Sequence, residues 1–75
     1  MSEFNLSVKR KFVLFCREKK ITQAAIANAT GVSAETARRW FNFEVEYLPP
    51  LSAIGWLREN YGLDVNRLLD KKGCY

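Results

Sequence analysis

Apolar residues recur along this chain with helical spacing, and the residues between them are of the types that begin and end helices. The first stripe follows i, i+4, i+7 and i+8 spacing and consists of Val8, Phe12, Phe15 and Cys16. This spacing predicts a helix over residues 8–20 with one buried face. Ser7 can cap its N-terminus, because a serine hydroxyl accepts a hydrogen bond from a free backbone N–H. Residues 1–6 would then form a short N-terminal arm.

The stretch from Gln23 to Asn42, QAAIANATGVSAETARRWFN, predicts two short helices joined by one tight turn. Gly31 separates them, and glycine adopts the left-handed conformation at a helix end without steric cost. Thr22 and Ser33 can cap the two helices. The predicted inward positions are Ile26 and Ala27 on the first helix and Ala37, Trp40 and Phe41 on the second. The second helix therefore presents a polar face outward.

A less regular segment follows the second of these helices. Residues 43–48 predict a loop or an extended segment, in which a short unpaired strand is conceivable. Pro49 and Pro50 end the segment, and Pro50 suits the first turn of a helix over residues 51–61. The predicted inward stripe of that helix is Leu51, Ile54, Leu57 and Tyr61.

Gly62 ends this helix, and Asp64 can cap a last short one that contains Val65, Leu68 and Leu69. Residues 71–75 are expected to fray as a C-terminal tail. The pattern contains no internal repeat. It predicts an all-α fold, a compact bundle of about five short helices that forms a single domain over residues 1–75.

The two-helix stretch resembles the helix-turn-helix of the lambda-repressor/Cro family of phage and bacterial regulators. The matching residues are Gln23, Ala27, Gly31, Val32, Ser33 and Trp40. The resemblance extends from about Val8 to Asp70, through Pro49–Pro50 and the closing YGLDVNRLLD. Thr30 and Ala37 depart from the family's usual residues. The loop 42–48 is longer than usual and carries Glu44 and Glu46, where family members often place groups that approach phosphates.

The resemblance implies that residues 33–42 form a recognition helix that enters the DNA major groove. The candidate DNA-binding residues in the motif are Thr22, Gln23, Ser33, Ala34, Glu35, Thr36, Arg38, Arg39 and Asn42. Arg17 and Lys20 lie close to the motif and are candidates for phosphate contacts. Lys9–Lys11 are expected to form a solvated face instead.

Several of these residues have more than one interpretation. Glu35 and Arg39 lie four residues apart, so an ion pair between them could simply support the helix. The same pair could fix the Arg39 guanidinium for guanine, or Glu35 could accept from a cytosine amino group. Gln23 could be an ordinary first-turn residue. Trp40 is expected to be core.

The charge distribution suits a polyanionic partner. The 75 residues carry a net charge of +4. Residues 1–40 contain eight Lys and Arg and three acids, whereas residues 41–75 contain four and five, so the positive charge lies in the first half. From position 19 to position 34 there is no acidic residue. A basic half is typical of nucleic-acid-binding domains, although small bacterial domains are often basic for no specific reason.

The residue types present argue against catalysis and cofactor binding. The chain has no histidine and no glycine-rich phosphate loop, and its two cysteines, Cys16 and Cys74, lack zinc-site spacing. We therefore expect no enzymatic activity, metal, cofactor or small-molecule ligand. Cys16 is expected to be a buried apolar residue, and a disulfide is disfavoured because nothing suggests secretion. With no signal peptide or membrane-spanning segment, a cytoplasmic location is expected.

We expect a sequence-specific transcriptional regulator of double-stranded DNA, with a repressor ahead of an activator, an excisionase or an antitoxin. The alternative is a helix-turn-helix fold used as a protein-interaction module without DNA binding, which Glu44 and Glu46 favour weakly. One recognition helix reads only a few base pairs. We therefore expect a homodimer on an inverted-repeat operator, with Trp56, or Phe43 and Tyr47, at the contact.

Overall fold

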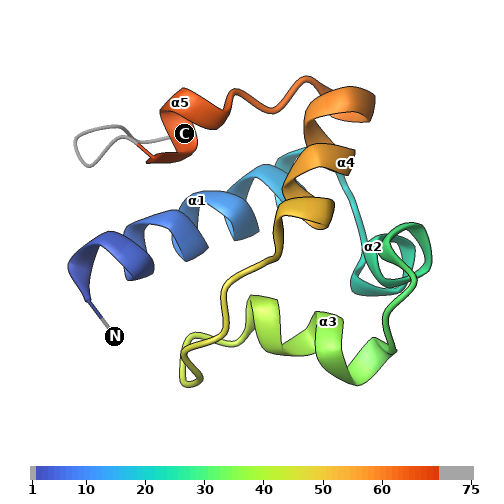
Figure 1. The fold of residues 1–75 in the computed structure, drawn as a ribbon, viewed down its shortest axis with the longest axis horizontal. Coiled ribbons are helices and arrows are strands. Elements are labelled where there is room, and N and C mark those ends of the chain that lie inside the picture. Colours follow the sequence, from blue (N-terminus) through green and yellow to red (C-terminus); the bar gives the residue numbers. More distant parts are fainter. Residues whose placement is uncertain (1, 70–75) are drawn as a thin grey trace.

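The computed structural model describes residues 2–69, which form five α-helices and no strand (Figure 1). In chain order these are α1 (Glu3–Glu18), α2 (Gln23–Thr30), α3 (Ala34–Phe41), α4 (Leu51–Tyr61) and α5 (Val65–Leu69). In Figure 1, α1 crosses the middle of the molecule with α5 on one side and α3 on the other, and α1 packs against both. α2 packs against α3 and α4. The predicted all-α class is confirmed, and residues 43–48 form a loop.

The first helix begins five residues earlier than the sequence pattern predicted. The Ser2 hydroxyl accepts a hydrogen bond from the Asn5 backbone N–H at 3.1 Å, so Ser2 is the N-terminal cap. Glu3 follows in the first turn, where a negative charge is stabilised by the helix dipole. Ser7 therefore lies inside α1. The prediction of an arm over residues 1–6 is wrong for residues 2–6, and Met1 lies outside the described residues.

The C-terminal end of α1 closes on a lysine in an unusual backbone conformation. Lys20 has a φ of 59°, the left-handed region that normally favours glycine. Its N–H donates to the Arg17 carbonyl at 3.1 Å, and the Ile21 N–H donates to the Cys16 carbonyl at 2.8 Å. These two bonds satisfy carbonyls that the end of a helix leaves free. Lys20 therefore holds a strained conformation because the chain must turn there into α2.

We expect Lys20→Gly to raise the free energy of unfolding by about 1 kcal/mol, because glycine removes the left-handed strain of about 1–2 kcal/mol and loses part of that gain to backbone entropy. Thermal unfolding followed by circular dichroism should show a melting temperature about 4–8 °C higher. Lys20→Ala is the matched control, since it removes the same charge but keeps a Cβ. An equal rise in both variants would assign the gain to charge and contradict this account.

The two helices and the turn between them form as predicted. Thr22 caps α2 by accepting from the Ala25 N–H at 3.0 Å, and Ser33 caps α3 by accepting from the Thr36 N–H at 3.2 Å. Gly31 ends α2 with a φ of 75°. A Cβ added at Gly31 would meet no atom within 4 Å, so only the backbone conformation requires glycine there.

The bounds of α4 match the prediction, but its buried face does not. Leu51 is 86% exposed and Tyr61 is 38% exposed, so both are wrong as inward positions. Ala53 and Leu57, four residues apart, are fully buried instead. Relative to the predicted orientation, α4 is rotated so that Ala53 faces the core. Leu51 is the first residue of the helix and lies outside the core. Pro50 is the residue before the helix, not part of its first turn.

The last described helix forms as predicted. Gly62 ends α4 with a φ of 74°, and the Asp64 carboxylate accepts from the Asn66 N–H at 3.0 Å to cap α5. Leu68 is fully buried, but Leu69 is half exposed. The predicted tail 71–75, which includes Cys74, lies outside the described residues. None of the helices in the described part combines the length and apolarity needed to cross a lipid bilayer.

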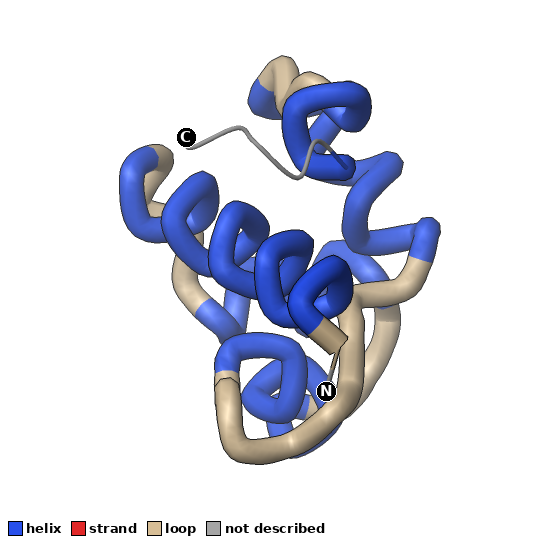
Figure 2. Tube along the Cα trace, turned by 90° about the vertical axis from the view of Figure 1, so that its left-hand side faces the viewer, coloured by secondary structure: helices blue, strands red, loops and turns tan. Residues whose placement is uncertain are grey.

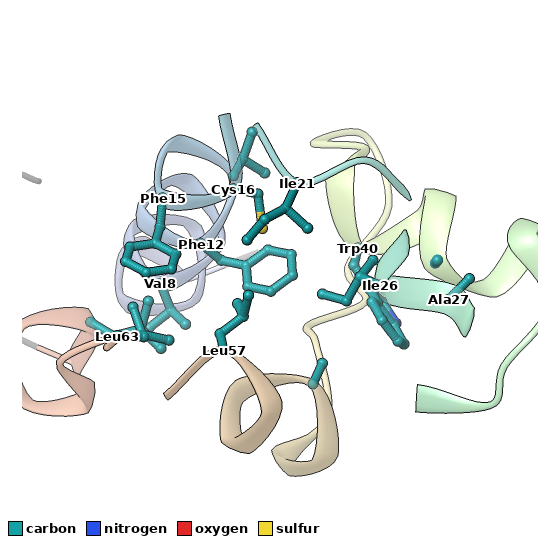
Figure 3. Close-up of a cluster of buried hydrophobic side chains, with 14 residues drawn as sticks. Val8, Phe12, Phe15, Cys16, Ile21, Ile26, Ala27, Trp40, Leu57 and Leu63 are labelled. Carbon is teal, nitrogen blue, oxygen red and sulfur yellow. The ribbon is translucent and has the colours of Figure 1, made fainter. Parts of the chain in front are cut away.

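One apolar core joins all five helices and the connection after α1. Figure 3 shows Phe12 of α1 pointing toward Leu57 of α4, with Trp40 and Ile26 together at the side of α2 and α3. Phe12 also packs against Phe41 of α3, with ring centroids 5.3 Å apart. Cys16 is fully buried, as predicted, and burial raises the pKa of its thiol to about 12. This thiol therefore stays protonated at neutral pH.

Candidate nucleic-acid interface

The outward face of α3 carries the charged residues that the sequence placed there. Ala37 and Trp40 are buried, with 0% and 4% of their surfaces exposed, and they fix the rotation of the helix. Ala34, Glu35, Arg38 and Arg39 consequently face solvent. The predicted facing of this helix, including Trp40 as a core residue, is confirmed. Figure 1 shows α3 at one edge of the molecule, with the rest of the chain on its other side.

Glu35 pairs with Arg38 and not with Arg39. The Arg38 Nη2 atom donates to Glu35 Oε1 at 2.8 Å, and both side chains are more than half exposed. The predicted interpretation with Glu35 and Arg39 as a pair is therefore wrong. Residues three apart on a helix are neighbours just as residues four apart are, so Arg38 competes for the same carboxylate. Such exposed pairs stabilise a helix only by about 0.3–0.5 kcal/mol.

Arg39 instead lies against the loop that follows α3. Its guanidinium carbon is 5.3 Å from the centre of the Tyr47 ring, which is the geometry of a cation–π contact. Tyr47 is 55% exposed. Within residues 2–69 no carboxylate pairs with Arg39. No hydrogen bond to another described residue engages the N–H donors of the Arg39 guanidinium.

The smaller polar residues of the motif are engaged in local hydrogen bonds. The hydroxyls of Ser33 and Thr36 are 3.0 Å apart, in addition to the capping bond between these residues. The side-chain Oδ1 atom of Asn42 accepts from the Glu44 backbone N–H at 2.9 Å. These side chains, like Thr22, shape helix ends and turns. Ser33 and Thr22 are exposed, and Thr36 and Asn42 are half-buried.

Arg17, Lys20 and Gln23 are exposed and lie on the path from the end of α1 into the first turn of α2. No hydrogen bond or ion pair among the described residues joins them to α3. These three residues therefore do not position Arg38 or Arg39 by direct hydrogen bonds or ion pairs.

The expectation that Lys9–Lys11 form a solvated face is wrong for Lys9 and Lys11. Lys9 is fully buried and Lys11 is 4% exposed, whereas Arg10 faces solvent. The Lys9 ammonium donates to the Val45 carbonyl at 2.7 Å, and the Lys11 ammonium donates to the Arg67 carbonyl at 3.1 Å. Burial lowers the pKa of Lys9. The long aliphatic stems lie along the core while each charge reaches a backbone acceptor.

The Lys9 contact ties the loop between α3 and α4 to α1. Figure 2 shows this loop as a long segment that passes the N-terminal half of α1. Lys9 precedes Phe12, Val13 and Cys16 at i, i+3, i+4 and i+7, so it lies on a buried stripe that the sequence already contains. That spacing could have identified it. Tyr47 left no such signal, because an irregular loop has no periodicity.

The described residues offer no alternative site for metal-dependent chemistry. Within residues 2–69 no group of three or more His, Cys, Asp or Glu side chains is placed to hold a metal ion. Of the described carboxylates, that of Asp64 caps α5 and that of Glu35 pairs with Arg38. The outward face of α3 and the loop beside it are therefore the candidate site among the described residues.

Comparisons with known proteins add no family to this description. Scans against protein-family models, curated proteins and solved structures find no match to this chain.

Proposed function

We propose that this protein binds double-stranded DNA in a sequence-specific manner and regulates transcription from the bound site. One observation carries the proposal: α3 projects Glu35, Arg38 and Arg39 into solvent while Ala37 and Trp40 hold the helix to the core. A short helix presented in this way after a tight turn suits the width of the major groove. The resemblance to the lambda-repressor/Cro family points the same way.

In the proposed complex, α3 lies in the major groove and Arg39 donates to a guanine, the commonest specific contact that arginine makes. Arg38 and Glu35 act as one ion pair at a neighbouring base pair. Arg17, Lys20 and the first turn of α2 hold phosphates and set the register of the protein on the duplex. Occupation of a promoter then blocks or recruits polymerase, with repression as the proposed outcome.

The proposal includes a homodimer on an inverted repeat, because one recognition helix cannot select a genomic site. Of the apolar residues considered for the contact, Phe43 is 43% exposed and Tyr47 is 55% exposed. Trp56 packs partly against the core and makes an edge-to-face contact with Tyr61, with ring centroids 5.3 Å apart. Phe43 and the loop around it are therefore the better candidates.

Selection from a library of random duplexes tests the proposal. We expect an enriched sequence with two-fold symmetry, and binding that weakens as salt rises, because each neutralised phosphate releases counterions. Arg17→Ala should weaken binding to all sequences alike and lower the slope of log affinity against log salt by about one. Arg58→Ala, which removes an exposed charge from α4, is the matched control.

The second candidate function is a protein-interaction module without DNA binding. The observation that favours it is the pair of exposed acids, Glu44 and Glu46, on the loop beside α3, since they repel phosphates. Failure of the wild-type protein to shift any duplex at low salt would support this candidate and contradict our proposal.

A further inference from the structure

We propose that Tyr47 is a positioning residue that holds the Arg39 guanidinium ready for base recognition, on a loop that the buried Lys9 anchors. The inference rests on the proposed function and assigns part of its specificity to a loop outside the two helices and turn. The observations that carry it are the Arg39–Tyr47 contact at 5.3 Å and the Lys9–Val45 hydrogen bond at 2.7 Å.

The geometry of the contact suits an arginine that must donate hydrogen bonds. A guanidinium bears all five N–H donors in its plane, whereas an aromatic ring attracts it through its face. Among the described residues, the Arg39 guanidinium donates no hydrogen bond, so Tyr47 can restrict this side chain while its donors stay available. An ion pair would restrict it by using those donors, as Glu35 does for Arg38.

The restriction matters because a free arginine side chain loses conformational entropy when it is fixed, and that loss opposes binding. A guanidinium already held against a ring loses less of that freedom on binding. The acids nearest in sequence to Tyr47, Glu44 and Glu46, do not pair with Arg39 among the described residues. Within residues 2–69, the Tyr47 ring is thus the only side-chain group with which the Arg39 side chain makes a hydrogen bond, an ion pair or a ring contact.

The loop can hold Tyr47 in place because it is fastened on both sides of this residue. At the start of the loop, the Asn42 side chain accepts a hydrogen bond from the Glu44 N–H. The Lys9 ammonium donates to the Val45 carbonyl, two residues before Tyr47. Pro49 is buried two residues after it. The ammonium of Lys9 is fully buried with the carbonyl as its acceptor, so releasing the loop would leave a buried charge without that partner.

The first test measures the contact in the free protein, without DNA. Side-chain NMR should show the Arg39 δ and ε protons shifted upfield by the Tyr47 ring current. Tyr47→Leu should abolish this shift, and Tyr47→Phe should preserve it. Tyr61→Leu, which removes an exposed aromatic ring from α4, is the control and should leave it unchanged. Arg39 signals that are identical in wild type and Tyr47→Leu would overturn the inference.

The second test measures the effect on recognition. Tyr47→Leu should reduce the preference for the selected duplex over one changed at the base pair read by Arg39 by about two- to five-fold, the equivalent of an exposed cation–π contact. Tyr47→Phe should restore the preference. In an Arg39→Ala background, Tyr47→Leu should have no further effect, because the residue acts through Arg39.

A third pair of variants tests Lys9, which anchors the loop. Lys9→Met should reduce both the ring-current shift and the preference, because the loop loses its hold on α1. Lys11→Met, which removes a buried lysine from the same helix but on the side of Arg67, should change neither. DNA binding whose preference Tyr47→Leu leaves intact overturns this inference alone. Absence of any DNA binding by the wild type overturns the proposed function, and the positioning role with it.

Discussion

Trp40→Ala is expected to lower the free energy of unfolding by about 3–5 kcal/mol. Trp40 is 4% exposed and lies in the cluster that joins α3 to α2 and the rest of the core, so its truncation leaves a cavity among side chains on several helices. A domain of 75 residues buries a modest fraction of its surface and has little stability to lose. The variant should therefore be largely unfolded near physiological temperature.

Chemical denaturation followed by the fluorescence of the remaining Trp56 measures this loss. Leu51→Ala is the control, because it also truncates a large apolar side chain on a neighbouring element, but one that is 86% exposed. We expect it to change stability by less than about 0.5 kcal/mol. A Trp40→Ala variant with wild-type stability would contradict the orientation of α3 and, with it, the outward placement of Arg38 and Arg39.

Arg39→Ala should weaken binding to the selected duplex by about 1–3 kcal/mol, or roughly 5- to 150-fold, and relax the preference at one base pair of each half-site. The reason is that a bidentate arginine contact discriminates between bases, whereas a phosphate contact does not. Fluorescence anisotropy with duplexes varied at single positions provides the measurement.

Arg38→Ala supplies the comparison, since it removes the same charge from the same helix but a guanidinium already bound to Glu35. We expect it to alter preference less than Arg39→Ala does. If Arg39→Ala weakened all duplexes by the same factor, Arg39 would be a phosphate contact, and the role assigned to Tyr47 would have no basis.

Local signals in the sequence predicted the elements that depend on local chemistry. Caps and turns are set by residues within four positions of each other, so Thr22, Gly31, Ser33 and Asp64 could be assigned their places correctly. The stripe of α3 was equally clear, because Ala37, Trp40 and Phe41 follow i, i+3 and i+4 spacing while charged residues occupy the other face. The start of α1 was misplaced since two serines, Ser2 and Ser7, both offer a capping hydroxyl.

The features that escaped prediction depend on contacts between distant residues. Lys9 bonds to a carbonyl 36 positions away, and no local pattern shows that an acceptor will be there. The buried face of α4 also depends on where α1 and α2 lie. For that reason the small Ala53 is buried in the core, whereas the larger Leu51 is exposed. In the candidate interface, the residues on helices were anticipated, whereas the partner of Arg39 was not.

The pairing of α1 with α5 has a consequence for how the protein is made. Lys11 reaches a carbonyl 56 residues further along, and Leu68 of α5 is fully buried. Ribosomes add about 5–20 residues per second, so residue 68 is added roughly 2.5–10 s after residue 18, the last residue of α1. During that time the apolar face of α1 and the Lys11 ammonium lack their final neighbours in α5. The core therefore cannot be completed until α5 has been synthesised.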